Sequence, residues 1–79
     1  MQLNEAVSKR LKELLDQRSM TQYELYSKSG VPKSTIGNII GCAYPSVKLR
    51  VIHEICQGLG ISITEFFQSS LFLEENLEP

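Results

Sequence analysis

Residues 29–40 read "SGVPKSTIGNII", and this stretch decides the fold. Gly30 is a residue that ends helices and Pro32 cannot continue one, yet an amphipathic pattern resumes directly after them. Its apolar residues Ile36, Ile39 and Ile40 would face a core. The stretch therefore predicts a tight corner between two helices. The outward face of the second helix carries only small or hydrogen-bonding side chains: Lys33, Ser34, Gly37 and Asn38.

Helix start and stop signals lie on both sides of this corner. Thr21 and Glu24 have the spacing of a capping box, so a helix of about two turns begins there and ends at Gly30. Pro32 suits the first turn of the next helix because its φ angle is fixed and its missing N–H has no partner there. That helix is expected at residues 32–40.

Three further helices are expected, and no segment predicts a strand. Each has a polar residue suited to cap its first turn, followed by apolar residues at helical spacing. Their expected bounds are 4–18 with Asn4 as cap, 46–59 with Ser46 as cap, and 62–67 with Ser62 as cap. Phe66 and Phe67 would close the core. The sequence thus predicts an all-α, compact five-helix domain.

Length and composition point to a single small domain. The chain has 79 residues, of which 42% are hydrophobic and 22% charged, as in ordinary globular proteins. A chain of this size buries only about 60–65% of its unfolded surface, which makes a deep substrate cavity improbable. We expect one domain at residues 1–70, folding alone or as a dimer. An acidic and apolar tail would follow at residues 71–79.

The charges of the chain are distributed unevenly. The net charge of −1 taken as a whole argues against a nucleic-acid partner. All eight Lys and Arg residues, however, precede residue 51, whereas Glu74, Glu75 and Glu78 crowd the chain end. Because residues 71–79 hold three acids and no base, the rest of the chain has a charge of +2. The alternative is that these charges only form a solvated surface.

Several functional classes are excluded by what the sequence lacks. No apolar run approaches the roughly 18 residues of a membrane span, and no signal peptide is recognisable, so we expect a cytoplasmic protein. Cys42, Cys56 and His53 have no metal-type spacing, and we expect two reduced thiols, no metal and no cofactor. His53 has no paired base, so neither an enzyme nor a small-molecule substrate is expected.

Two short helices joined by a glycine-containing corner indicate a helix-turn-helix. The segments "MTQYELYSKSGVPKSTIGNII" and "LRVIHEICQGLGISITEFF" resemble the lambda-repressor/Cro-like (Xre family) DNA-binding domain, over residues 7–67. The matching positions are Thr21-Gln22, Leu25, Gly30-Val31, Ser34-Thr35-Ile36, Leu59-Gly60-Ile61-Ser62 and Glu65-Phe66-Phe67. The resemblance implies a lambda-repressor-like fold. It also implies a sequence-specific transcriptional regulator, expected to be a repressor, that binds double-stranded DNA.

The resemblance implies that the helix at residues 32–40 enters the major groove, while the helix at residues 21–29 lies across the backbone. Small outward side chains would let the groove helix approach the bases closely. Its expected base contacts are Lys33, Ser34, Gly37 and Asn38. Lys33 would donate to guanine, and Asn38 would pair with adenine or hold a phosphate. The alternative for these residues is an ordinary helix surface.

Phosphate contacts are expected beside the groove helix. Gln22 matches a family position where a glutamine at a helix start commonly contacts phosphate. Ser46 and Lys48 stand at another expected helix start, where free amides favour an anion. The full expected set is Gln22, Thr35, Tyr44, Ser46 and Lys48. Two alternatives remain: Gln22 serves as a cap or surface residue, and Tyr44 packs over its own loop.

Two positions depart from the family pattern. Tyr26 stands where alanine is usual, so either the two helices of the corner splay apart or the ring points along the surface. Ile40 stands where a polar or acidic residue is often found, and it would simply enlarge the core. Neither departure predicts a loss of DNA binding.

Assembly and the competing functional class depend on the chain end. Specific DNA affinity normally comes from two half-sites, so we expect a homodimer. Its interface is expected at the fifth helix and at Leu71, Phe72, Leu73 and Leu77, which alternatively fold back over their own core. The competing class is a protein-interaction module that keeps the fold, such as an antitoxin-like or adaptor protein. DNA binding that weakens steeply with added salt would support the regulator, whereas no DNA binding at low salt would support the interaction module.

Overall fold

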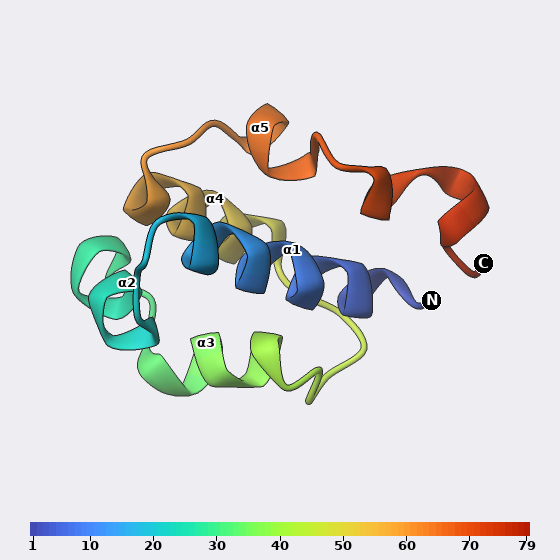
Figure 1. The fold of residues 1–79 in the computed structure, drawn as a ribbon. Coiled ribbons are helices and arrows are strands. Elements are labelled where there is room, and N and C mark those ends of the chain that lie inside the picture. Colours follow the sequence, from blue (N-terminus) through green and yellow to red (C-terminus); the bar gives the residue numbers. More distant parts are fainter.

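The computed structural model describes residues 1–79 and contains five α-helices, two short 3-10 helices and no strand. The elements are α1 (Leu3–Gln17), α2 (Gln22–Ser29), α3 (Lys33–Ile40), α4 (Leu49–Leu59), α5 (Ile63–Phe67), η1 (Ser70–Phe72) and η2 (Glu74–Asn76). Figure 1 shows α1 crossing the middle of the molecule, with α3 below it, α5 above it and α2 at one end. The prediction of an all-α, five-helix domain is confirmed.

The corner between α2 and α3 is built as the sequence predicts. The Thr21 hydroxyl accepts from the Glu24 amide at 3.1 Å, and the Glu24 carboxylate accepts from the Thr21 amide at 3.1 Å. Gly30 ends α2 in the left-handed conformation, with φ of 76°, and its N–H donates to the Tyr26 carbonyl at 2.9 Å. Pro32 precedes α3 as its N-cap rather than lying inside the first turn.

Two of the expected caps are wrong. Asn4 lies inside α1, and its amide donates to the Tyr44 carbonyl at 3.0 Å instead of capping the helix. The cap is Gln2, two residues earlier, where the Glu5 carboxylate accepts from the Gln2 amide at 2.8 Å. Ser46 lies in an exposed loop, because α4 begins only at Leu49. The Asn4 contact joins residues that are distant in the chain, which the local sequence does not reveal.

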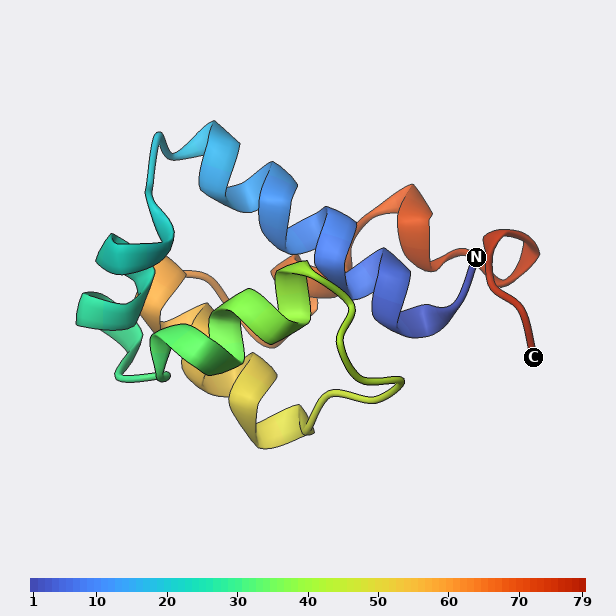
Figure 2. The same ribbon diagram turned by 90° about the horizontal axis from the view of Figure 1, so that it is seen from below.

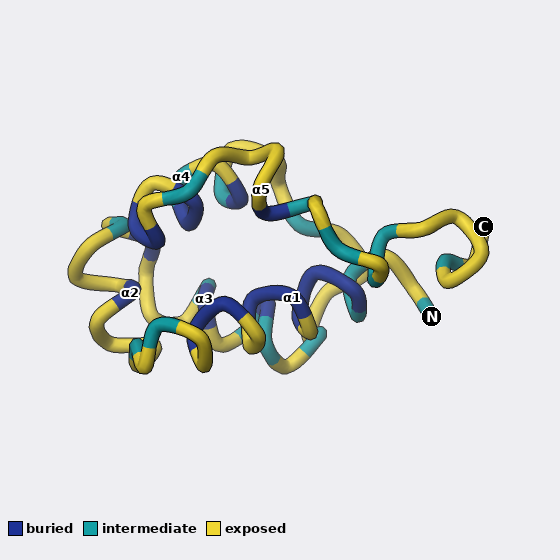
Figure 3. Tube along the Cα trace, turned by 45° about the horizontal axis from the view of Figure 1, so that its top comes forward, coloured by how far each residue is buried: buried dark blue, intermediate teal, exposed yellow.

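The core lies between all five α-helices, and its buried residues lie along their inward sides (Figure 3). Phe66 is fully buried and contacts Phe67 edge-on, with ring centroids 5.0 Å apart. Gly58 is buried where α4 meets α2. A Cβ atom added at Gly58 would lie 2.6 Å from the Ser29 Cβ. The two helices therefore pack so closely that only glycine fits at this position.

Two polar side chains are buried, and each has a partner. The Ser8 hydroxyl donates to the Ile40 carbonyl at 2.7 Å, which joins α1 to the end of α3. The Arg10 guanidinium donates to the carbonyls of Phe66 at 2.7 Å and Glu65 at 2.8 Å. These carbonyls lie at the end of α5, which has five residues, so Arg10 anchors a helix too short to be stable alone.

The two departures from the family pattern are accommodated without disturbing the corner. The Tyr26 ring is 39% exposed and lies along the surface, while Leu25 and Val31 stay buried between α2 and α3. The two helices therefore do not splay. Ile40 is half-buried and packs against the core cluster, which it enlarges as expected.

The chain end folds back over its own domain. The Phe72 ring lies 4.8 Å from Phe67 and 6.3 Å from Phe66, measured between centroids. The Met1 amino group donates to the Asn76 carbonyl at 2.9 Å, and so joins the two ends of the chain. Phe72 was expected either at the dimer interface or folded back over its own core. Because it contacts Phe66 and Phe67 inside the monomer, a dimer contact through Phe72 would have to compete with these contacts.

The other apolar residues of the tail are less enclosed. Leu71 and Leu77 are half-buried, and Leu73 is 49% exposed. Their role in dimerisation stays a prediction, and so does the division of the chain at residue 70. Helix η1 spans that boundary, since it runs over residues 70–72.

Both cysteines are free thiols. Cys42 is half-buried in the loop after α3, where its φ of 53° is left-handed. Cys56 is fully buried in α4. Burial, followed by the charge of nearby Glu65, raises the pKa of the Cys56 thiol. Its side chain is therefore protonated wherever the domain is folded near neutral pH.

None of the helices combines the length and the apolar character that a transmembrane span requires.

Candidate nucleic-acid interface

Helix α3 has two distinct faces. Ile36 and Ile39 are buried in the core, whereas Lys33, Ser34 and Gly37 are exposed. Thr35 and Asn38 are half-buried at the edge between these faces. Residues three and four apart lie on one side of a helix, so the four expected base contacts share the outward side of α3. The face expected from the sequence is therefore present.

Gly37 is not required by the packing of the domain. A Cβ atom added there would have no heavy atom within 4 Å, apart from its own helix and chain neighbours. Its φ is not in the left-handed range, so other residues could adopt its backbone conformation. Glycine inside a helix costs about 0.5–1 kcal/mol relative to alanine. The packing of the domain therefore leaves room for a side chain at Gly37, and the close approach of a partner at this position stays a prediction.

A depression beside α3 brings together five of the expected contact residues. Its volume is about 250 Å³. It lies between α3, the loop after it and the start of α4. The expected contacts that line it are Thr35, Asn38, Tyr44, Ser46 and Lys48. Hydroxyl, amide and ammonium donors therefore lie around one shallow hollow whose remaining lining includes the apolar residues Ile39, Val47 and Val51. The donors could hold an anionic group such as a phosphate at its rim.

The loop at residues 41–48 is held in place by hydrogen bonds at both of its sides. The Ala43 amide donates to the Asn38 carbonyl at 2.9 Å, and this hydrogen bond ties the start of the loop to the end of α3. The Asn4 side chain holds the Tyr44 carbonyl from α1. The Tyr44 ring itself is 64% exposed, so the alternative of an aromatic packed over its own loop is wrong. Asn4 is a positioning residue that sequence reasoning missed.

The starts of α3 and α4 differ from those of the other three helices. Neither start has a side-chain cap or an acidic residue in its first turn. Lysines stand there instead, Lys33 as the first residue of α3 and Lys48 as the N-cap of α4. The other helices each have a side-chain hydrogen bond at their start and a first-turn glutamate: Glu5, Glu24 and Glu65.

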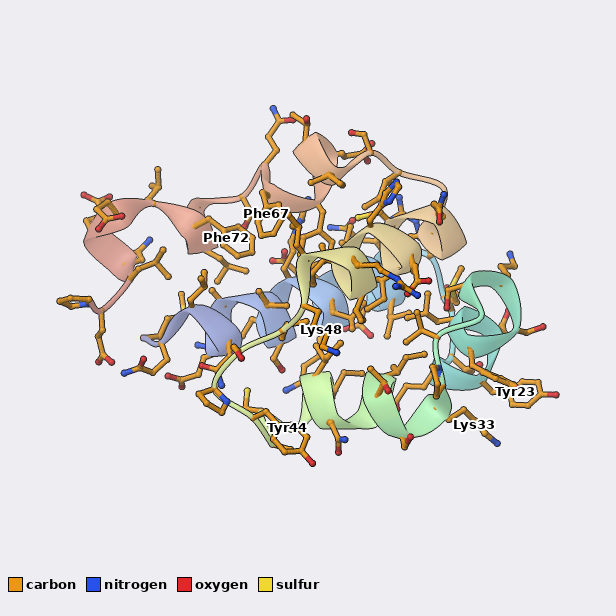
Figure 4. All side chains as sticks on the ribbon, turned by 180° about the vertical axis from the view of Figure 1, so that it is seen from behind. Tyr23, Lys33, Tyr44, Lys48, Phe67 and Phe72 are labelled. Atoms are coloured by element: carbon orange, nitrogen blue, oxygen red, sulfur yellow. The ribbon has the colours of Figure 1, made fainter.

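This difference has an electrostatic consequence. The amino end of a helix is positive, so acids there are stabilising and lysines are not. In α3 and α4 the free amides and the lysine ammonium add to the same positive field. Both helix starts are thus unfavourable by themselves and favourable next to an anion. Figure 4 shows Lys48 and Tyr44 toward one end of α3 and Lys33 at the other.

Gln22 lies apart from this depression. It is the first residue of α2, and it is exposed. It lines a separate, shallow hollow together with Lys12 and Ile40. The cap of α2 is Thr21, so the cap alternative for Gln22 is wrong. The phosphate contact of Gln22 and its alternative, a surface role, both stay predictions.

Two tyrosines next to Lys33 are a further feature that sequence reasoning missed. The rings of Tyr23 and Tyr26 lie one turn apart on α2, with centroids 5.9 Å apart. The Lys33 ammonium is 5.3 Å from the Tyr23 centroid and 5.7 Å from the Tyr26 centroid. Figure 4 shows Tyr23 and Lys33 projecting at the same corner. The sequence signal was an aromatic pair at i and i+3 outside the apolar stripe of α2.

Two of the eight basic residues serve the fold rather than the surface. Arg10 holds the end of α5, and Arg18 donates to the Leu59 carbonyl at 3.2 Å at the end of α4. The six exposed basic residues are Lys9, Lys12, Lys28, Lys33, Lys48 and Arg50. The positive charge available to a partner is therefore smaller than the composition suggests.

The tight corner between α2 and α3 and the polar outer face of α3 place this protein in the class of helix-turn-helix DNA-binding proteins. Comparison with protein families agrees. Residues 10–69 match the Cro/C1-type HTH DNA-binding domain, and the chain belongs to that family. The resemblance seen in the sequence is thereby confirmed, and the protein is a DNA-binding transcription regulator. The family is one of DNA-binding domains and not of enzymes.

Two similar solved structures are of one regulator. They are the wild-type restriction-modification controller protein C.Esp1396I and a mutant of it with one tyrosine replaced by phenylalanine. Each is 26% identical in sequence, with a TM-score of 0.78. The alignments cover 86% of this chain, 87% of the wild-type chain and 85% of the mutant chain. No curated protein sequence matches the chain.

Proposed function

We propose that this protein is a sequence-specific repressor that inserts α3 into the major groove of double-stranded DNA. The observation that carries the proposal is the pair of uncapped, lysine-bearing helix starts at α3 and α4, of which Lys48 lines the depression beside α3. Both would gain stability only next to anions. A repressor that reads DNA works where the DNA is, so the cytoplasm stays its proposed location.

Base reading is assigned to the outward face of α3. Lys33 donates to guanine O6 or N7 from the exposed start of the helix, and Asn38 pairs with adenine or holds a phosphate. Ser34 donates to or accepts from a base edge. Gly37 lets the helix backbone approach the groove floor, which agrees with the open space around its Cα atom.

Phosphate contacts are assigned to the residues around the face. Thr35, Tyr44, Ser46 and Lys48 grip one backbone segment, since they line one depression. Gln22 contacts the backbone at the start of α2. These contacts position the protein on the duplex and carry no base information.

The protein is also proposed to bind as a homodimer to a two-fold operator. One α3 helix reads only a few base pairs, and two half-sites about 34 Å apart supply specific affinity. The proposed interface comprises α5 and the tail, with Ile63 at 36% and Leu73 at 49% exposure as its open apolar residues. A two-fold axis through this surface places the same residues against each other.

A selection of bound sites from random duplex DNA tests the assignment of roles. Asn38→Ala and Lys33→Ala should each change the preferred base at one position, at a cost of about 1–3 kcal/mol. Gln22→Ala is the matched control, because it should weaken binding to all duplexes by a similar factor. The assignment of roles is wrong if Gln22→Ala changes the preferred sequence and the two α3 variants do not.

A salt titration separates DNA binding from the alternative of a protein-interaction module. That alternative is favoured by an apolar depression of about 230 Å³, whose lining includes Leu3, Leu49 and Phe67. A regulator that neutralises phosphates should lose affinity steeply as salt rises. If no duplex is bound even at low salt, an antitoxin-like or adaptor role is the better account.

A further inference from the structure

Tyr23 and Tyr26 are large aromatic residues that the core does not use. They are 62% and 39% exposed, respectively, and lie on the outer side of α2. Their rings are tilted by 59° to each other. Neither hydroxyl has a hydrogen-bond partner within the chain. Exposing two adjacent aromatic rings to water is costly. The side chain that both rings contact is Lys33.

The Lys33 ammonium is held by these rings and by no acid. Both ring centroids lie within about 6 Å of it, the range of a cation–π contact. The two ion pairs of the chain join Arg10 to Glu13 and Arg18 to Glu65, so neither includes Lys33. The nearby Glu24 carboxylate on α2 is occupied by its own helix cap, where it accepts from Thr21.

Holding a lysine with aromatic rings differs from holding it with a carboxylate. A carboxylate would cancel the positive charge and would itself repel the phosphates of DNA. The rings attract the ammonium while leaving its full charge, and they use no directional acceptor. Its three N–H groups cannot all point at two rings, so a donor stays free for a base. The side chain is restricted before binding, which lowers the entropy lost on binding.

We infer that Tyr23 and Tyr26 are positioning residues for Lys33, and that they set the base preference at a pair which they do not touch. The inference rests on the proposed function, in which Lys33 reads a base. The Tyr26 ring completes the site around the ammonium, and it lies on the outer side of α2 while Leu25 and Val31 keep α2 and α3 packed.

The experiment uses two leucine and two phenylalanine variants of the full chain. Tyr23→Leu and Tyr26→Leu keep apolar volume but remove the ring, whereas Tyr23→Phe and Tyr26→Phe keep the ring and remove the hydroxyl. The first readout is the NMR chemical shift of the Lys33 ε-methylene in the free protein. Ring currents should displace this shift in the wild type and both phenylalanine variants, and the displacement should shrink in the leucine variants.

The second readout is base discrimination at the position read by Lys33, measured with duplexes that differ at that pair alone. Each leucine variant should lower the discrimination by about 2- to 5-fold, the effect of one exposed cation–π contact, and the phenylalanine variants should not. In a Lys33→Ala background the leucine substitutions should have no further effect on it, because they act through the lysine.

The results of these experiments distinguish a failure of the inference from a failure of the proposed function. The inference is overturned if the leucine variants weaken all duplexes equally, if their effect persists without Lys33, or if the phenylalanine variants lose as much as the leucine variants. The last result would make the hydroxyls phosphate contacts. A wild-type protein that binds no duplex overturns the proposed function, and the inference with it. A wild type that binds, combined with any of the three results above, overturns the inference alone.

Discussion

Two glycines show how the same residue serves the surface in one helix and the core in another. Gly37 in α3 and Gly58 in α4 both weaken their helices relative to alanine. A side chain at Gly58 would collide with Ser29, whereas one at Gly37 would meet nothing. Of these two glycines, only Gly58 is therefore required by the packing of the fold, and the role proposed for Gly37 is the close approach of DNA.

The two glycines should respond to alanine with opposite signs of stability. We expect Gly37→Ala to raise the free energy of unfolding by about 0.5–1 kcal/mol, measured by urea denaturation, and to lower DNA affinity. Gly58→Ala should lower the free energy of unfolding by about 1–3 kcal/mol, because α2 and α4 must move apart. If Gly37→Ala bound DNA as tightly as the wild type, close approach at that position would be excluded.

Residue-scale prediction from the sequence succeeded where the cause was local. Gly30 was identified as the end of α2, and the structure gives it a left-handed φ of 76°. The polar outer face of α3 was likewise visible in the spacing of its apolar residues. The Lys33 site was not visible, because it joins residues from two helices whose separation depends on the geometry of the corner.

Helix boundaries were predicted well only where the cap is a local motif. The starts of α2 and α5 were correct, since Thr21 and Ser62 bond to amides three residues ahead. The start of α1 was wrong because the Asn4 amide finds a carbonyl 40 residues away in the chain. No local pattern carries that information. Ser46 failed as a cap because the loop continues to Lys48, which is the N-cap of α4.

The tail is the element whose role the sequence left open between a dimer interface and a cover for the monomer. In the structure, neighbouring residues of the tail have different surroundings. Phe72 lies against the phenylalanines of α5, whereas Leu73 does not pack against the core cluster and is 49% exposed. The core contact and the proposed interface therefore use adjacent residues of the same short segment.

Substitutions at these adjacent residues should separate folding from assembly. Leu73→Lys should lower the dimer fraction in analytical sedimentation while changing the free energy of unfolding by less than about 0.5 kcal/mol. Phe72→Ala is the matched variant, and it should cost about 1–3 kcal/mol of stability because it removes a half-buried ring. An unchanged dimer with Leu73→Lys would move the interface elsewhere, for instance to helix α1.

At the scale of the whole molecule, the three glutamates of the tail lie away from the α3 face, while the other six acids lie in the helical body. The acidic tail lies on the far side of α1 from α3, as two perpendicular views show (Figures 1 and 2). Exposed lysines stand at both ends of the α3 face, which is the surface proposed to meet DNA. The net charge of −1 therefore does not describe the field near that face, because exposed charges are screened over about 10 Å.

This separation predicts which charges affect DNA binding. Lys48→Gln should make the slope of log affinity against log salt less steep by about 0.9, the value for one phosphate contact. Replacing Glu74, Glu75 and Glu78 together by glutamine should leave that slope unchanged, although the formal charge of the chain changes by three. A tail variant that altered the slope as much as Lys48→Gln would place the chain end next to the DNA.

The buried Cys56 thiol makes the opening of the folded domain measurable without any denaturant. Only the thiolate reacts with alkylating reagents, and this thiol is both inaccessible and shifted to a higher pKa in the folded chain. Since the unfolded chain ionises first as pH rises, the free energy of unfolding should decline above the ordinary thiol range and be unaffected below it. Mass spectrometry should resolve rapid modification of the half-buried Cys42 from slow modification of Cys56. The slow modification rate of Cys56 reports how often the region around α4 opens. Operator DNA should reduce this rate by a factor of 1 + L/Kd, where L is the concentration of free operator and Kd is the dissociation constant of the complex.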